Sequence, residues 1–167
     1  KRKSAFLIAM SGGSGSGKST LAEALLDHLG SDKAVMFGED AYYHPMRHYG
    51  EYQTEAERNA LVAGINYDDP KSKEADRLVK DVKESAPVLI LEGIHALSFA
   101  KIHSLIDLSV YVDTPDDLRL ARRIRRDVTE RGRTIESVLQ QYLGTVRAAH
   151  YQWTYPAKFE ADLVIAD

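Results

Sequence analysis

Short apolar runs alternate along the chain with longer stretches in which apolar residues recur every three or four positions. The runs predict strands at residues 6–10, 34–37, 88–91, 108–112 and 163–165. The longer stretches predict helices at residues 18–29, 74–83, 115–129 and 134–151. This alternation is typical of an α/β three-layer sandwich, in which helices cover both faces of a mostly parallel sheet. Ligands in such folds bind beyond the carboxyl ends of the strands, so the segments that follow the strands are expected to form the binding site.

The loop between the first strand and the first helix has the pattern Gly-x-x-x-x-Gly-Lys-Ser/Thr, as in P-loop NTPases. Its glycines let backbone N–H groups converge on phosphate oxygens, and the next helix adds the positive end of its dipole. Lys18 is expected to reach the β- and γ-phosphates, and the Ser19 hydroxyl to bind Mg²⁺. A flexible Gly/Ser linker would lack the flanking strand and helix. The expected ATP-binding residues are Gly12, Gly13, Ser14, Gly15, Ser16, Gly17, Lys18, Ser19 and Thr20.

Two carboxylates follow predicted strands and so belong at the same edge of the sheet as this loop. Glu92 ends the run 88–91, where P-loop proteins hold Mg²⁺ directly or through water. Asp40 follows the run 34–37, where a carboxylate can accept the proton of an attacking hydroxyl. Each also has a purely structural interpretation, because a strand-end Glu starts turns and an Asp caps loops and helices. Beside a phosphate loop, we expect Glu92 to be a metal ligand and Asp40 to be the catalytic base.

An arginine-rich segment with a central glycine predicts a lid at about residues 116–140. Gly132 breaks the helical pattern, and the next helix begins near Thr134. Two helices that meet at such a turn can close over polyphosphate, where guanidinium groups neutralise the charge on the transferred group. A solvated charged helix is the main alternative, and a nucleic-acid patch is a weaker one. The arginines are Arg119, Arg122, Arg123, Arg125, Arg126, Arg131 and Arg133.

Composition limits the class of protein. A length of 167 residues predicts one domain of ordinary size over 1–167, and 44% hydrophobic with 28% charged residues is typical of a globular protein. No apolar run is long enough to span a bilayer, and the basic residues at 1–3 lead into a strand, so we expect a cytoplasmic protein without a membrane partner. The chain has no cysteine, which excludes disulfides and thiolate metal sites. A formal net charge of -3 predicts no general attraction to nucleic acid.

Taken together, these segments resemble the uridine kinase and phosphoribulokinase family of P-loop kinases, most closely its uridine–cytidine kinase branch. The resemblance covers nearly the whole chain, and the lid run is its most family-specific piece, because a phosphate loop alone occurs in many unrelated NTPases. Besides the phosphate loop, it rests on Asp40-Ala41-Tyr42-Tyr43, on Asn66-Tyr67-Asp68-Asp69-Pro70, on Glu92-Gly93-Ile94 and on the lid run from Arg122 to Arg133.

The resemblance implies ATP and Mg²⁺ as cofactors, a small-molecule acceptor, and homo-oligomers as one option. It implies that Asp40 is the catalytic base and that Tyr43 is a pocket aromatic, and it puts Asp68 on the ribose hydroxyls. By the same resemblance Arg123 and Gln141 face the nucleoside. The groups expected to stabilise the transferring charge are Lys18, Arg126, Arg131 and Arg133, and the expected metal ligands are Ser19 and Glu92.

One departure from the family concerns the acceptor. Uridine–cytidine kinases carry a pyrimidine-reading hairpin before the Glu-Gly strand, whereas here only Lys71 to Pro87 separate the two elements and no such run is present. Either this protein lacks the hairpin and accepts a different hydroxyl substrate, or the printed sequence omits a segment.

The expected activity is transfer of the γ-phosphoryl group of ATP to a hydroxyl, first of all the 5′-hydroxyl of uridine or cytidine. A related alternative keeps the chemistry and changes the acceptor to nicotinamide riboside, pantothenate or a sugar phosphate. A third is a nucleotide-binding switch that is not a kinase. The chain has no Asn-Lys-x-Asp element that would read guanine, which argues against a GTPase switch.

Overall fold

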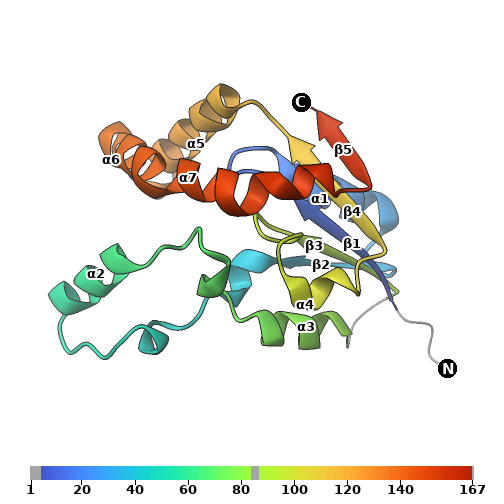
Figure 1. The fold of residues 1–167 in the computed structure, drawn as a ribbon, viewed down its shortest axis with the longest axis horizontal. Helices are drawn as coiled ribbons and strands as arrows, with labels where there is room; N and C mark the ends of the chain where they lie inside the picture. The colour runs from blue at the N-terminus through green and yellow to red at the C-terminus, as the bar shows by residue number, and fades with distance from the viewer. Residues whose placement is uncertain (1–4, 84–86, 167) are drawn as a thin grey trace.

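Five parallel strands form the sheet at the centre of the computed structural model, which describes residues 5–83 and 87–166 (Figure 1). The order across the sheet is β2-β3-β1-β4-β5, and every neighbouring pair is parallel. All five predicted strands are confirmed, and each extends one residue further at its carboxyl end. Their bounds are β1 Phe6–Ser11, β2 Ala34–Gly38, β3 Val88–Glu92, β4 Leu108–Asp113 and β5 Leu163–Ala166.

Alternate residues of the strands pack into two hydrophobic clusters, one on each face of the sheet. Leu7, Leu89 and Leu91 pack with Leu78 and Ile102, which belong to helices α3 (Ala75–Lys83) and α4 (Ala100–His103). The odd-numbered and even-numbered positions of β1 and β3 therefore face different layers.

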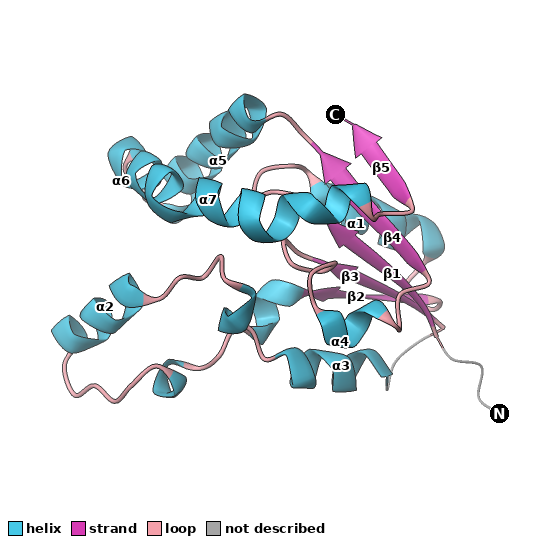
Figure 2. Ribbon diagram, in the orientation of Figure 1, coloured by secondary structure: helices cyan, strands magenta, loops and turns pink. Residues whose placement is uncertain are grey.

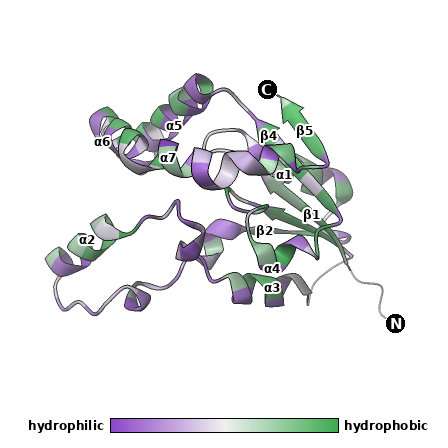
Figure 3. Ribbon diagram, in the orientation of Figure 1, coloured by the Kyte–Doolittle hydropathy of each residue, from purple (hydrophilic) through white to green (hydrophobic). Residues whose placement is uncertain are grey.

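The opposite face is covered by helix α1 (Lys18–Leu29). Ile8, Met10 and Ile90 pack there against Ala22, and apolar residues of α1 such as Leu25 border the cluster. Figure 3 shows hydrophobic residues concentrated on the strands between these layers. The α/β three-layer sandwich expected from the sequence is confirmed.

The lid segment forms two helical stretches joined by a left-handed glycine. Helix α5 spans Asp116–Arg131, two residues beyond its predicted end, and Gly132 follows with φ 62°, its N–H donating to the carbonyl of Asp127. Helix α6 (Ile135–Gln141) then begins, with Thr134 accepting a hydrogen bond from the N–H of Ser137.

The second stretch is longer and less regular than the predicted helix 134–151. A π-helical segment at Tyr142–Val146, helix α7 (Arg147–Ala149), a second π-helical segment at His150–Thr154 and a 3-10 turn at Tyr155–Phe159 continue it (Figure 2). Pro156 lies in the first turn of the last segment, where its missing N–H costs nothing, so the stretch continues past it.

Residues 39–74 leave the sheet after β2 and return to it before β3. The excursion contains helix α2 (Glu55–Gly64), which begins with a reciprocal capping box between Thr54 and Glu57 and lies away from the sheet in Figure 1. Short 3-10 turns at Glu39–Tyr42, Met46–His48 and Pro70–Ser72 flank it. The sequence did not predict α2, because its apolar residues show no clear helical period and none of them is buried. Helix α4 was also missed, since four residues are too few to show a period.

None of the helices in the described ranges 5–83 and 87–166 has the length and apolar character that crossing a bilayer requires.

Leu91→Ala should lower the free energy of unfolding by about 2–5 kcal/mol, because Leu91 is fully buried on the interior strand β3 and its loss leaves a cavity. Urea denaturation followed by circular dichroism measures this. Val35→Ala, on strand β2 with 36% of the residue exposed, is the control and should cost less than about 1 kcal/mol. Equal effects of the two substitutions would contradict the assignment of the core.

Candidate active site

Three predicted site segments meet because β3 pairs with both β1 and β2. In the parallel register Glu92 lies beside Met10 on one side and beside Gly38 on the other. The phosphate loop follows β1, and Asp40 follows β2 by two residues. The carboxyl ends of the three strands therefore bring the loop, Glu92 and Asp40 to one edge of the sheet.

The phosphate loop runs from β1 into the first turn of α1. Gly17 precedes the helix with φ 87°, a left-handed conformation that favours glycine. At Gly13 a Cβ atom would lie 2.1 Å from a guanidinium nitrogen of Arg119, so glycine is needed there for close packing. Of the predicted loop residues, Gly12, Gly13 and Ser16 are buried, Ser14, Gly15 and Lys18 are half-buried, and Gly17, Ser19 and Thr20 are exposed.

The predicted metal ligands lie next to each other. The Ser19 hydroxyl donates a hydrogen bond to Oε2 of Glu92 at 3.1 Å, which joins the start of α1 to the end of β3. Burial raises the pKa of Glu92, while the Lys18 ammonium and the Ser19 hydroxyl oppose the shift. Burial also lowers the pKa of Lys18, and Glu92 opposes that shift.

The side-chain oxygens of Ser19 and Glu92 suit Mg²⁺, which takes further ligands from water and phosphate, better than a metal ion that is bound by protein groups alone. The described parts of the chain contain no group of three or more His, Cys, Asp or Glu side chains that could hold a metal ion. Mg²⁺ commonly binds through one or two protein oxygens, several waters and substrate phosphates, and the oxygens of Ser19 and Glu92 are the two that could serve in this way.

A cavity of about 350 Å³ lies between the sheet edge and the lid. All the residues predicted from the sequence to be catalytic, substrate-binding or metal-binding line it. The lining residues are Ser14, Lys18, Ser19, Asp40, Tyr43, Tyr67, Asp68, Glu92, Gly93, Ile94, Arg123, Arg126, Arg131, Arg133 and Gln141. A second cavity of about 490 Å³ lies beside α2, and none of the predicted site residues lines it.

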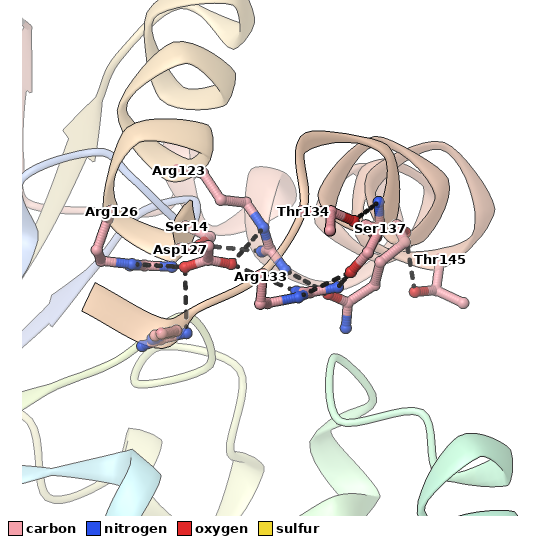
Figure 4. Close-up of polar contacts among 10 residues, drawn as sticks. Ser14, Arg123, Arg126, Asp127, Arg133, Thr134, Ser137 and Thr145 are labelled. Atoms are coloured by element: carbon pink, nitrogen blue, oxygen red, sulfur yellow. Dashed lines mark hydrogen bonds and ion pairs between the residues drawn. The ribbon is translucent and has the colours of Figure 1, made fainter. Parts of the chain in front are cut away.

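Four arginines of the lid converge on one buried carboxylate. Asp127 is fully buried, and its oxygens lie 2.8 Å from Arg126, 3.4 Å from Arg131 and from Arg133, and 3.7 Å from Arg123. Figure 4 labels Arg123, Arg126 and Arg133 beside Asp127. Burial alone would raise the pKa of Asp127, but the arginines hold it below its usual value. The carboxylate thus lets four cations share one wall of the cavity.

Gln141 links the two lid helices to the phosphate loop. Its Oε1 accepts hydrogen bonds from Arg123 at 2.9 Å and from Arg133 at 2.6 Å. Arg123 also donates to the hydroxyl of Ser14 at 3.2 Å. Arg119, which the sequence analysis counted among the lid arginines, is instead buried against Gly13 and donates to the carbonyl of Thr114, outside the cavity.

The opposite wall carries the predicted acceptor residues. The side chain of Asp40 is 78% exposed and accepts a hydrogen bond from Lys73 at 3.3 Å. The Tyr43 hydroxyl donates to the carbonyl of Tyr67 at 3.3 Å, and the two rings meet edge to face. Burial raises the pKa of Asp68, while Arg123 across the cavity opposes the shift.

Three buried polar residues behind this wall were not predicted. Glu39 and Lys73 form an ion pair with an N–O distance of 2.9 Å and no exposed side-chain surface. The Nε2 atom of His95 lies 2.6 Å from the carbonyl oxygen of Asp68. For Glu39, the sequence offered one signal, its position beside Asp40 directly after a predicted strand. Lys73 and His95 belong to none of the motifs identified in the sequence.

Comparison with known proteins gives a consistent result. The model of the phosphoribulokinase / uridine kinase family matches the chain over residues 7–86 and 79–167. A uridine kinase of Lactiplantibacillus plantarum is 34% identical over 194 aligned residues, which cover 100% of this chain and 89% of the relative. A uridine kinase of Clostridium novyi is 35% identical, with 96% of this chain and 86% of the relative covered.

Solved structures agree on the fold. A putative fructose transport system kinase from Silicibacter sp. TM1040 has a TM-score of 0.72 at 21% identity, with 98% of this chain and 91% of that chain covered. Phosphoribulokinase from Rhodobacter spheroides has a TM-score of 0.65 at 18% identity, with 98% and 70% covered. The sheet, the phosphate loop and these matches over nearly the whole length show that the chain belongs to the phosphoribulokinase / uridine kinase family, whose members are phosphotransferases acting on a hydroxyl group.

Proposed function

We propose that this protein transfers the γ-phosphoryl group of ATP to the 5′-hydroxyl of a pyrimidine nucleoside, uridine or cytidine. The observation that carries the proposal is the composition of the 350 Å³ cavity, which has phosphate-binding groups on one wall and acceptor-binding carboxylates on the other. The uridine kinase relatives support the nucleoside as acceptor. They also disfavour the third alternative, a nucleotide-binding switch.

The donor half consists of the phosphate loop and the lid. Lys18 would neutralise the β- and γ-phosphates, while the loop N–H groups and the start of α1 bind phosphate oxygens. Arg126, Arg131 and Arg133 would stabilise the negative charge that spreads over the transferring group. Ser19 and Glu92 would hold Mg²⁺, which would neutralise part of the negative charge on the phosphates.

The acceptor half consists of Asp40, Tyr43, Asp68, Arg123 and Gln141. Asp40 would accept the proton of the attacking hydroxyl, and its exposed carboxylate reaches the cavity that Glu92 and Lys18 also line. Asp68 would accept hydrogen bonds from the ribose hydroxyls. Arg123 and Gln141 are held by their mutual hydrogen bond on the lid side, where they would contact the nucleoside.

A different hydroxyl acceptor is the second candidate. The family model matches the chain in two stretches, which overlap at residues 79–86. The alignment with the Lactiplantibacillus relative spans 194 positions, whereas this chain has 167 residues. The relative therefore has residues without a counterpart in this chain, as expected if the pyrimidine-reading hairpin is absent. This observation favours weaker selection at the base than in relatives that carry the hairpin.

Purified protein with Mg²⁺-ATP should release ADP when uridine or cytidine is added, and far less without an acceptor. The panel includes nicotinamide riboside and pantothenate, and EDTA is the control for the metal requirement. Turnover with only a non-pyrimidine acceptor would favour the second candidate. ADP release at the same rate with every acceptor and with none would contradict kinase function.

Asp40→Asn should lower kcat by about 10²–10⁴-fold, because the amide cannot accept the hydroxyl proton in the chemical step. The KM for ATP should change little, since Asp40 is assigned no contact with the nucleotide. Steady-state kinetics with saturating acceptor measures both values. A wild-type kcat would remove Asp40 from the mechanism.

Asp68→Ala should raise the KM for the nucleoside about tenfold to a hundredfold, because hydrogen bonds to a charged acceptor are worth about 1.5–3 kcal/mol. The KM for ATP should stay near the wild-type value. Titrations of each substrate at a saturating level of the other separate the two effects. If the KM for ATP rises and that for the nucleoside does not, the assignment of the acceptor wall is wrong.

A further inference from the structure

A buried lysine lies directly behind the proposed catalytic base. The Nζ atom of Lys73 is 2.9 Å from Oε1 of Glu39 and 3.3 Å from Oδ1 of Asp40. It also lies 3.7 Å from the centre of the Tyr43 ring. The Lys73 side chain has no exposed surface, so its ammonium group is held among these three partners.

The backbone fixes this lysine in place. Tyr43 and Lys73 form an isolated antiparallel bridge, so the segments around them run side by side. The N–H of His44 donates to the carbonyl of Ser72, and the N–H of Glu74 donates to the carbonyl of Tyr42. Lys73 therefore enters the site from the segment that also carries Asp68.

Glu39 anchors the ammonium group from the other side. Its Oε2 accepts a hydrogen bond from the backbone N–H of His95 at 2.8 Å, which leaves Oε1 for Lys73. A Cβ atom at position 93 would lie 2.2 Å from the Glu39 carboxylate, so Gly93 leaves it just enough room. The carboxylate is thus locked against the end of β3, and its position determines that of the ammonium group.

The stability of the fold gives no reason for such an arrangement. Taking two charges out of water costs several kcal/mol per ion, and well-packed apolar residues often do as well or better. The same pair has a clear use next to Asp40, whose side chain is 78% exposed and has no other hydrogen-bond partner shown within the described residues. An exposed carboxylate without a fixed partner would move among several rotamers.

We propose that Lys73 is a positioning residue for Asp40: anchored by Glu39, its ammonium group binds one carboxylate oxygen and leaves the other oriented toward the acceptor hydroxyl. This inference rests on the proposed function, because it requires Asp40 to act as the base. Nothing in the motifs of the family assigned a role to Lys73. Precise orientation of a reacting group accounts for a large part of enzymatic rate enhancement, and a misplacement of 1 Å can cost about a hundredfold.

The charges around the ammonium group are consistent with this role. Burial alone would lower the pKa of Lys73, but Glu39, Tyr43 and Asp40 together raise it above its usual value, so the amine stays protonated. Burial raises the pKa of Tyr43 to about 12, and burial with the nearby Lys73 lowers the pKa of His95 to about 4, so both are neutral near pH 7. Lys73 also acts on the pKa of Asp68, which burial raises and the charge of Lys73 helps to lower.

The test compares the Glu39→Gln/Lys73→Met variant in two backgrounds. The double variant replaces the ion pair with neutral side chains of similar size, because Lys73→Met alone would leave a buried charge and could fail to fold. With Asp40 present, kcat for uridine should fall about tenfold to a hundredfold, while the KM for ATP stays within about twofold. In an Asp40→Asn background, the same two substitutions should cause no further loss, since the base they position is gone. Lys71→Met, an exposed lysine of the same segment, is the control and should behave as wild type.

Two results would overturn the inference while leaving the proposed function intact. One is a wild-type kcat in the Glu39→Gln/Lys73→Met variant when Asp40→Asn alone is slow. The other is an equal loss in both backgrounds, which would mean that the pair supports the structure independently of Asp40. If Asp40→Asn itself turns over like wild type, the role of the base fails and the inference fails with it.

Discussion

The hydrogen bonds that hold β3 between β1 and β2 set the geometry on which the rest of the site depends. Glu92 is in register with both Met10 and Gly38, so the chain that leaves each of these strands starts from the same edge. The phosphate loop, Glu92 and the segment of Asp40 are placed there by backbone pairing rather than by contacts among their side chains. A shift of one residue in either ladder would move Glu92 to the other face of the sheet and away from Ser19.

Charge on the walls of the cavity is balanced by carboxylates buried behind them. Asp127 has this role in the lid, where it gathers four guanidinium groups that would otherwise repel one another. Glu39 has the same role on the acceptor side, where it holds the ammonium group of Lys73. In both places the carboxylate has no exposed side-chain surface. The arginines that Asp127 binds line the cavity, and the lysine that Glu39 binds contacts Asp40, which lines it. The site is thereby preorganised before substrate arrives, which avoids reorganising these groups during the reaction.

The sequence predicted those parts of the molecule that are determined locally. The five strands and the phosphate loop follow from apolar runs and a fixed motif, and the lid from its arginines and Gly132. Helix α2 was missed because its apolar residues show no clear period and none of them is buried, although the Thr54-x-x-Glu57 capping box was a signal in the sequence. The Glu39–Lys73 pair could not be predicted either, since it joins residues 34 positions apart and only the folded excursion of residues 39–74 brings them together. The extension of the second lid stretch to Phe159 depends on π-helical turns, for which a period of 3.6 residues gives no signal.

Most of the residues assigned to the acceptor half lie in the excursion of residues 39–74 between β2 and β3. It supplies Asp40 and Tyr43 on its outgoing part and Asp68 and Lys73 on its return, and backbone hydrogen bonds tie the two parts together. The donor half, by contrast, is built from the phosphate loop, which occurs in many unrelated NTPases, and from the lid. In the proposed function, selection of the acceptor rests on Tyr43 and Asp68 of this excursion and on Arg123 and Gln141 of the lid, all of which line the same cavity.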